Sequence, residues 1–212
     1  MAGKYLNSVL QIKENIYGKE SAEAAKAHDA RGDHSLMHMA DFGKAIEYYE
    51  KAKKIRLNLY GANDPRTTEN YGRLAMSMFY FGDKKNRAEK LLLHSVDIRK
   101  NSPTNNDFPL YGIYMDLGIY YSMKDEYTNS IAYLKKALTA FKGNAKSNYI
   151  MILSELSRIY LNKNDFQNSM IYAKGAYAKA KEFYKDSQHP QVVEHLRQMN
   201  EINDMIKSNR SR

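Results

Sequence analysis

A short motif returns along this chain at a nearly constant spacing, and this recurrence constrains the fold more than any other feature of the sequence. Segment 41–52 reads DFGKAIEYYEKA, and related segments follow at 126–137 (EYTNSIAYLKKA) and 165–173 (DFQNSMIYA). The small residues of these units and of a further one are spaced by 43, 42 and 39 positions: Ala45, Ala88, Ser130 and Ser169. A period of roughly 20 to 50 residues indicates a stacked repeat array.

The composition favours helices in every repeat. Proline is scarce, at 4 residues, and long stretches consist of the helix formers Ala, Leu, Lys, Glu and Met. The hydrophobic fraction of 43% and the 18 Tyr and 7 Phe are too high for a disordered chain. Apolar runs such as 149–153 are too short for a membrane-spanning helix, and the N-terminus shows no secretory signal. We therefore expect an all-α cytoplasmic protein that does not contact a membrane.

A second motif precedes each return of the first. Tyr114, Leu117, Gly118 and Tyr121 match an aromatic-x2-Leu-Gly-x2-Tyr pattern, and small Ser130 and Ala137 follow at the expected distance. The same places hold Leu153, Leu156, Ser157 and Tyr160 in the last repeat, and Tyr71, Leu74, Ala75 and Met78 in the second. A small residue lets two helices approach closely while large residues pack around it. Each repeat is thus predicted to be a pair of helices.

On these motifs the chain resembles the tetratricopeptide-repeat (TPR) family over nearly its whole length. The long spacing, and the linker that runs from Gly61 through three residues to Pro65, resemble the kinesin light chain subgroup. The resemblance implies a right-handed superhelical solenoid of antiparallel helix pairs. It also implies a non-enzymatic adaptor or scaffold that holds a peptide or helix of a partner protein in a concave groove.

The repeat register divides the chain into one domain, 1–207, followed by a disordered tail at 208–212. Segment 12–18 echoes 55–61 at a distance of 43 residues, so Ala2, Leu6 and Val9 occupy second-helix positions and the chain begins in the middle of a repeat. The expected parts are a half repeat at 1–18, repeats at 22–60, 65–101, 108–142 and 146–186, and a capping helix at 190–207. The sequence does not indicate an oligomeric state.

In the resembling arrays the first helix of each repeat lines the groove, which selects candidate binding residues by register. They are Glu69, Arg73, Met76, Tyr80, Met115, Ile119, Ser122, Met123, Glu155, Arg158 and Asn162. Kinesin light chain repeats carry an Asn-Asn pair where this chain has Gly72-Arg73, Met115-Asp116 and Ser154-Glu155, so we do not expect the same cargo peptides. A short amphipathic or acidic-aromatic peptide fits a methionine-rich centre flanked by two arginines.

The net charge of +9 permits two interpretations. Basic residues gather near the C-terminal halves of second helices, as in the set Lys51, Lys53, Lys54 and Arg56. There they complement the helix dipole and solvate an outer face, which is the interpretation we favour. The alternative is docking on an acidic lattice such as a cytoskeletal filament. Nucleic acid is not expected as a partner, because the tyrosines follow helix-packing positions rather than a base-stacking pattern.

No motif in the sequence points to catalysis. Phosphate-binding glycine loops and hydrolase signatures are missing, and the absence of Cys excludes thiol chemistry, so we expect no enzyme, cofactor or small-molecule substrate. His34 and His38 would share a helix face with Asp41 one turn further on, which could form a zinc site. Two ligands at helical spacing are common by chance, so we predict no metal and regard these residues, with His28, as surface or capping histidines. The tripeptide Arg31-Gly32-Asp33 is expected inside a helix.

Overall fold

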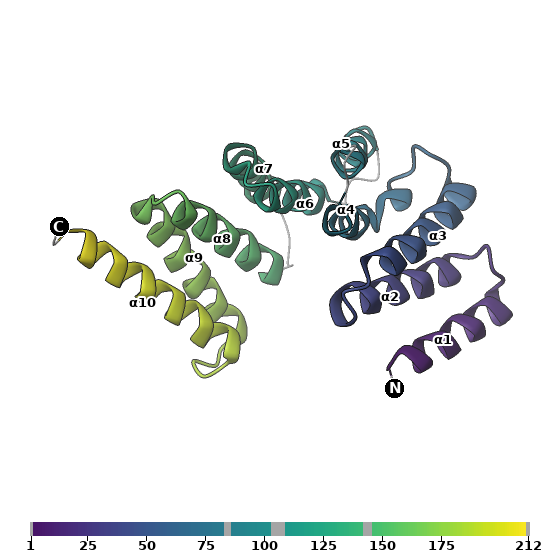
Figure 1. Ribbon diagram of the computed structural model, residues 1–212, viewed down its shortest axis with the longest axis horizontal. Helices are drawn as coiled ribbons and strands as arrows, with labels where there is room; N and C mark the ends of the chain where they lie inside the picture. Colours follow the sequence, from purple (N-terminus) through teal and green to yellow (C-terminus); the bar gives the residue numbers. More distant parts are fainter. Residues whose placement is uncertain (1, 83–85, 103–108, 142–145, 211–212) are drawn as a thin grey trace. The chain divides into compact units, whose positions relative to one another are not determined.

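The computed structural model describes residues 2–82, 86–102, 109–141 and 146–210, and within these ranges it contains helices and no strand (Figure 1). The helices are α1 (Ala2–Tyr17), α2 (Ala22–His38), α3 (Phe42–Tyr60), the 3₁₀ helix η1 (Pro65–Thr68), α4 (Tyr71–Tyr80), α5 (Arg87–Lys100), α6 (Leu110–Met123), α7 (Tyr127–Ala140), α8 (Lys146–Asn162), α9 (Phe166–Tyr184) and α10 (Pro190–Arg210). The prediction of an all-α repeat fold is confirmed.

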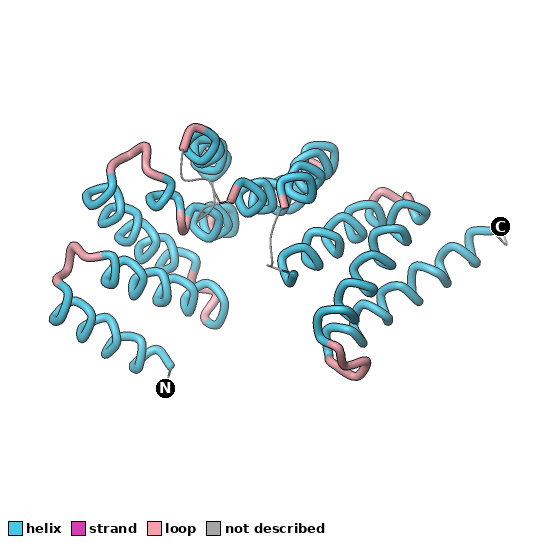
Figure 2. The backbone as a smooth tube through the Cα atoms, turned by 180° about the vertical axis from the view of Figure 1, so that it is seen from behind, coloured by secondary structure: helices cyan, strands magenta, loops and turns pink. Residues whose placement is uncertain are grey.

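The chain divides into two compact units, 1–120 and 121–212, and the boundary falls inside α6. In the first unit α1 packs against α2, α2 against α3, α3 against α4, and α4 against α5. In the second unit α7 packs against α8, α8 against α9, and α9 against α10. Short described loops join α1 to α2, α2 to α3, α8 to α9 and α9 to α10, as the tube in Figure 2 shows. Within each unit, these helices therefore pack on their neighbours in the chain, as expected for a repeat array.

Local signals in the sequence set the helix ends. Ser21, Asp41 and Asp165 are N-caps whose side chains accept hydrogen bonds from backbone N–H groups three residues later, at 3.0 to 3.1 Å. Gly18 and Gly61 adopt φ values of 85° and 84°, where a side chain would be strained, and each directly follows the tyrosine that ends a helix. The Tyr-Gly pair thus stops α1 and α3 in the same way.

The recurring small residues lie in the interior of the two units. Ala45, Ala88, Ser130 and Ser169 are all 0% exposed. Several large apolar side chains are also fully buried: Leu74, Leu92, Ile113 and Leu117 in the first unit, and Leu134, Ile152, Leu156 and Ile159 in the second. The repeat register predicted from these small residues therefore matches the packing of the helices.

Some expected boundaries coincide with helix ends and others differ. Segment 22–60 contains α2 and α3, and 146–186 contains α8 and α9. Both ends of the segment expected at 108–142 lie outside the described residues. Helix α10 continues to Arg210, three residues beyond the expected end of the capping helix, and residues 211 and 212 of the expected tail are outside the described part of the chain. None of the described helices has both the length and the apolar character needed to cross a bilayer.

Candidate functional site

In the first unit, four predicted groove residues follow one another along α4 and the turn before it. Glu69 lies between η1 and α4, while Arg73, Met76 and Tyr80 lie on α4 itself. Arg73 and Tyr80 are exposed and Met76 is half-buried. The Nε of Arg73 lies 3.0 Å from Oδ1 of Asp33 on α2, and the Arg73 side chain remains 55% exposed. The structure thus adds Asp33, which the register did not single out, to this face.

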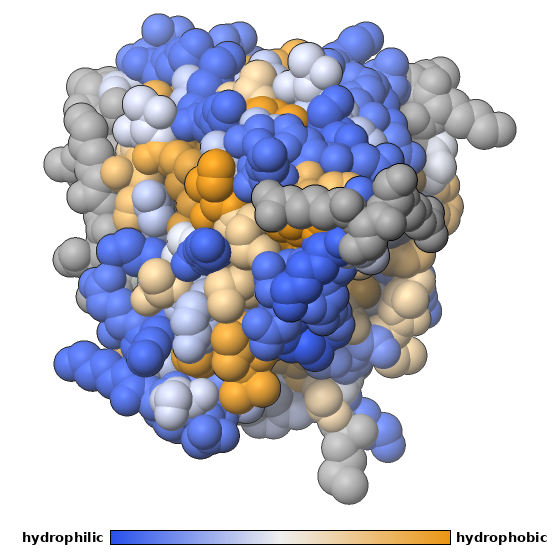
Figure 3. Space-filling model, turned by 90° about the vertical axis from the view of Figure 1, so that its left-hand side faces the viewer, coloured by the Kyte–Doolittle hydropathy of each residue, from blue (hydrophilic) through white to orange (hydrophobic). Residues whose placement is uncertain are grey.

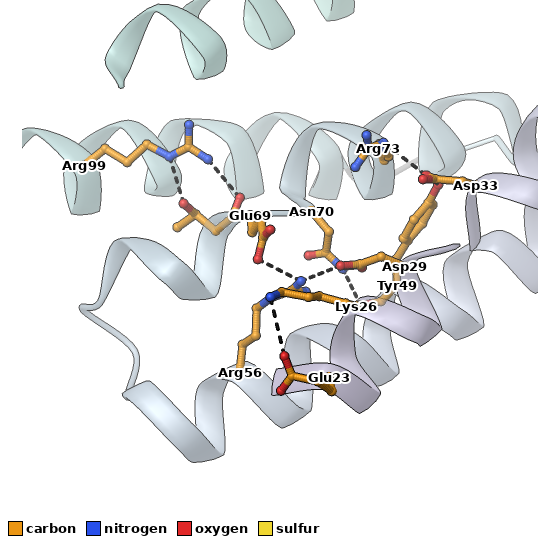
Figure 4. Close-up of polar contacts among 11 residues, drawn as sticks. Glu23, Lys26, Asp29, Asp33, Tyr49, Arg56, Glu69, Asn70, Arg73 and Arg99 are labelled. Carbon is orange, nitrogen blue, oxygen red and sulfur yellow. Dashed lines mark hydrogen bonds and ion pairs between the residues drawn. The ribbon is translucent and has the colours of Figure 1, made fainter. Parts of the chain in front are cut away.

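Beneath this face lies a buried charged network, shown in Figure 4. Arg56 of α3 is 2% exposed and forms ion pairs with Asp29 of α2 and, at 2.9 Å, with Glu69. The side-chain amide of Asn70 donates to Oδ1 of Asp29 and to the backbone oxygen of Tyr49, both at 2.9 Å. Burial works to lower the pKa of Arg56, but its hydrogen bond to Asp29 and the two carboxylate charges outweigh burial and raise it.

This network corrects one prediction. The sequence placed Arg56 among the solvated cations of the outer face, and that assignment is wrong because the residue points between helices toward Asp29. It also changes the role of Glu69, since a carboxylate that neutralises a buried arginine is less available to a partner.

A second buried arginine, Arg99 of α5, is 7% exposed. Its Nε donates to Oγ1 of Thr68 at 2.8 Å, and a terminal nitrogen donates to the Thr68 backbone oxygen at 3.0 Å. The Asp116 carboxylate of α6 lies directly over Gly72, where any Cβ would collide with it. Burial raises the pKa of Asp116 to about 6, against the opposing charges of Arg99 and Arg73. The Asp116 carboxyl therefore keeps its proton to a higher pH than an exposed aspartate does.

Three further predicted groove residues lie on α6. Met115 and Ile119 belong to the first unit and Met123 to the second, and all three are half-buried. They retain apolar surface that a partner could contact. Methionine side chains adapt to differently shaped apolar groups, so the α6 positions suit a varied set of ligands.

In the second unit the predicted residues are connected to one another. Arg158 donates from Nε to Oε2 of Glu155 at 3.0 Å and from a terminal nitrogen to Oγ of Ser122 at 2.6 Å. Its side chain is 51% exposed. Ser122 is only 3% exposed and lies beneath the arginine, so it supports Arg158 and is not itself a contact surface. The amide of exposed Asn162 lies 3.5 Å from the Tyr127 hydroxyl.

Both candidate arginines are therefore held in place before any partner arrives. Arg73 contacts Asp33, and Arg158 contacts Glu155 and Ser122. A partner carboxylate would share these guanidinium groups with internal acceptors rather than meet a free cation. Such pairing lowers the entropy cost of binding and also reduces the electrostatic gain.

An exposed aromatic surface adjoins Tyr80, and the sequence register missed most of it. The Phe42 and Tyr80 rings stack with centroids 5.0 Å apart. Phe81 is 68% exposed, Met37 73% and Met39 64%. These residues occupy helix ends and the turn after α2, where the repeat motif does not define which side chains face solvent. The stacked Phe42 and Tyr80 rings, with the exposed Phe81 directly after Tyr80, form an apolar surface of the kind that commonly marks an interaction site.

The histidine segment lies within and just after α2. The rings of His34 and His38 lie 5.5 Å apart, but α2 ends at His38 and Asp41 caps α3 instead of extending the pair. His28 is 7% exposed, 3.7 Å from a carboxylate oxygen of Glu14, so its assignment as a surface residue is wrong. Among the described residues, no group of three or more His, Asp or Glu side chains is arranged to hold a metal ion. The Arg31-Gly32-Asp33 tripeptide lies inside α2, as expected.

The lysines of the second helices have local partners. Lys53 Nζ lies 2.6 Å from Glu50 on α3, and Lys136 Nζ lies 4.6 Å from the centre of the Tyr133 ring on α7. Figure 3, which views the side on which α10 lies in Figure 1, shows hydrophilic residues over much of the surface with hydrophobic residues between them. Positive charge is thus spread over helix surfaces and partly compensated there.

A cleft of about 490 Å³ lies in the second unit between the α8–α9 turn and the end of α10. It is lined by Lys163, Asn164, Asp165, Phe166, Gln167, Ile206 and Asn209. None of these residues belongs to the predicted groove set, so the cleft is separate from the first-helix positions.

Residues 25–59, which lie within α2 and α3, match the family model described as tetratricopeptide repeat. The chain contains a tetratricopeptide repeat. The match includes Asp29 and Arg56 of the buried network and confirms the family indicated by the repeat motifs. A search of curated proteins found no match.

Solved structures of TPR-like repeats are similar in fold to most of this chain. Two crystal structures of nearly identical TPR-like repeats, described as from a kinesin light chain of Podosopora anserina, align with TM-scores of 0.58 and 0.60. The second is the structure of a variant of those repeats with one substituted residue. Each is 15% identical and covers 87% of this chain and 88% of the other. At this identity the likeness shows the TPR fold alone.

Proposed function

We propose that this TPR chain is an adaptor or scaffold without catalytic activity, which binds a peptide or helix of a partner protein on the exposed faces of its first helices. TPR repeats are generally protein-interaction modules, and the family match supports that general role. The observation that carries the finer proposal is the pair of half-exposed arginines, Arg73 and Arg158, each positioned by an internal carboxylate.

The surroundings of the arginines suggest what the peptide contains. In the first unit, the exposed aromatic surface around Tyr80 and Phe81 is on the same helix as Arg73 or directly follows it. An apolar or aromatic side chain could pack on these rings while an acidic side chain contacts the guanidinium. Aromatic and arginine side chains are the residue types that most often dominate binding energy. An acidic-aromatic peptide is therefore the ligand class we propose.

The test begins with peptides selected from a random library against the intact protein. Replacing Arg73 and Arg158 together with Ala should weaken binding of the selected peptides about tenfold, which corresponds to about 1.4 kcal/mol. The effect is limited because both arginines already share their charge with internal carboxylates. Helicity and thermal stability should change little, since exposed substitutions usually alter stability by less than about 0.5 kcal/mol. The two single variants show which unit supplies the contact.

The matched control removes two positive charges elsewhere, by Lys53→Ala and Lys136→Ala. These lysines lie on second helices and contact Glu50 and Tyr133. The control should leave peptide affinity almost unchanged. If this control weakens binding as much as the double arginine variant does, affinity depends on the net charge of the protein. Docking on an acidic lattice then becomes the better account. In that case binding should also fall steeply with salt.

A further inference from the structure

The contact between first and second helices of a repeat is best seen in the second unit, between α8 and α9. Ser157 and Ser169 exchange hydrogen bonds through their hydroxyl and backbone oxygens at 2.9 Å. One turn away the Tyr160 and Tyr172 rings stack, with centroids 5.5 Å apart and planes 7° apart. Leu153, with Ile150, completes the stripe of α8 residues that packs on α9. Through this stripe of side chains, the first helix of the repeat packs against the second.

Helix α10 repeats the same stripe 43 residues later. Its members are Val193, Leu196, Asn200 and Asn203, which correspond in order to Ile150, Leu153, Ser157 and Tyr160. The neighbouring face of α10 is buried, with Val192 1% and Ile202 2% exposed, and α10 packs against α9. The stripe itself is open, since Val193 is 45% and Leu196 37% exposed. In the described part of the chain, the α10 stripe is thus the exposed counterpart of the stripe that α8 buries against α9.

Helix α1 shows the complementary arrangement. It lies 43 residues before α3, so Val9 and Ile12 correspond to Ala52 and Ile55, which pack in α3 against the alanines of α2. In α1 this side is uncovered: Tyr5 is 71%, Ile12 53% and Ile16 66% exposed. Among the described helices, α1 thus has the register of a second helix, with the side that α3 packs against α2 left exposed.

Tyr5 also occupies the stacking position of the repeat. It lies three residues after Ala2, as Tyr133 lies three after Ser130 and Tyr172 three after Ser169. Both of those tyrosines stack on a tyrosine of the preceding first helix, with centroids 5.5 Å apart in each case. The side chain at the same position in α1 is among the most exposed hydrophobic groups of the described chain.

We infer that α10 of one copy of this chain docks on α1 of a second copy, so that the two halves form one repeat across the interface. Leu196 then packs near Val9 and Ile12, Asn200 lies over the small Ala2, and Asn203 approaches the Tyr5 hydroxyl. The two surfaces differ, so the contact is head-to-tail and each added copy leaves one free face at either end. Because Asn200 and Asn203 replace Ser157 and Tyr160, the interface is less apolar than the α8–α9 contact, and association should require high concentration.

Sedimentation equilibrium of the 212-residue chain over a wide concentration range tests this inference. The mean mass should rise with concentration beyond that of a dimer. Ile12→Asp places a charge on the α1 face, and Leu196→Asp places one on the α10 face. Each substitution should prevent docking at that face, so each variant alone should stay monomeric. When mixed, they should form a 1:1 heterodimer, because the first variant keeps an intact α10 and the second an intact α1. Ile171→Asp is the control, since Ile171 is 62% exposed on α9 and lies outside both stripes.

Several outcomes would overturn the inference. The wild type could remain monomeric at every concentration, or the Ile171→Asp control could lower association as much as the other variants. If Leu196→Asp still dimerises and the mixture gives no heterodimer, α1 pairs with α1 of the second copy instead. Circular dichroism establishes that each variant is folded. If Ile12→Asp unfolds α1, Tyr5→Lys serves as a second variant that places a charge on the α1 face.

Discussion

Each unit contains an arginine that contacts two carboxylates, but the arginine of the first unit is buried and that of the second is exposed. Arg56 in the first unit is 2% exposed and contacts Asp29 and Glu69. Arg197 in the second unit has a side chain that is 57% exposed, and it contacts Glu194 and Glu201 on its own helix. An arginine with two carboxylates therefore joins three segments of the chain in the first unit. In the second unit the same set of groups lies on the exposed surface of one helix.

The repeat register explains why the units differ. Two second helices of the first unit have arginine eleven residues after the small residue, as Arg56 follows Ala45 and Arg99 follows Ala88. Both arginines are buried. The same position in the second unit holds Phe141 after Ser130 and Ala180 after Ser169. One repeat position thus contributes a charged junction to the first unit and an apolar contact to the second, within the same fold.

The largest expected effect comes from removing the buried cation. Arg56→Ala should lower the free energy of unfolding of the first unit by about 3 to 5 kcal/mol, because Asp29 would remain as an uncompensated buried charge. Urea titration followed by circular dichroism measures the loss. The double variant Asp29→Leu, Arg56→Met should recover most of it, since an apolar pair of similar volume leaves no charge behind. A loss below about 1 kcal/mol in the single variant would mean that the pair behaves as a solvated surface ion pair.

Asp116 provides a smaller, pH-dependent effect in the first unit. Its pKa is raised from 3.8 to about 6 in the folded state, mainly by burial, so the folded protein binds this proton more tightly than the unfolded chain does. The stabilisation is fully present below the unfolded pKa and is lost as the pH rises through 6. Asp116→Asn, which cannot ionise, should therefore match the wild type near pH 4 and exceed its stability by about 1 to 2 kcal/mol at pH 7, after allowance for partial exposure.

Unfolding midpoints of both proteins between pH 4 and 7 measure this difference, and the contributions of all other carboxylates cancel in the comparison. A difference that grows in the opposite direction, with the wild type more stable at pH 7, would show that the ionised Asp116 is held by Arg99 and Arg73. The charged junction of the first unit would then include Asp116 as a stabilising anion.

The smallest effect is expected for the exposed arginine of the second unit. Arg197→Ala should change the free energy of unfolding by less than about 1 kcal/mol, because exposed ion pairs gain little and are screened by salt. Thermal unfolding at low and high salt checks this, and any small loss should disappear at high salt. A loss comparable to that of Arg56→Ala would remove the contrast between buried and exposed arginines on which the comparison of the two units rests.

The sequence by itself determined the helix pairs, their register and the repeat family, because these depend on the spacing of small and large residues along one chain. Ala45, Ala88, Ser130 and Ser169 were identified by spacing alone and are all fully buried. The contact of Arg158 with Glu155 also follows from helical spacing, since Glu155 lies one turn before it. Such local relations are set by helix geometry.

Only the tertiary structure decided which charged residues are solvated. Arg56 and Lys53 are both basic residues of α3, yet one is buried against Asp29 and the other pairs with Glu50 on the surface. Likewise, Gly72 admits the Asp116 carboxylate from another helix, and Ser122 lies under Arg158 instead of facing a partner. The contacts of Arg56 with Asp29, of Arg158 with Ser122 and of Gly72 with Asp116 join residues 27 to 44 positions apart. Their energies depend on burial and on partners that helical spacing does not specify.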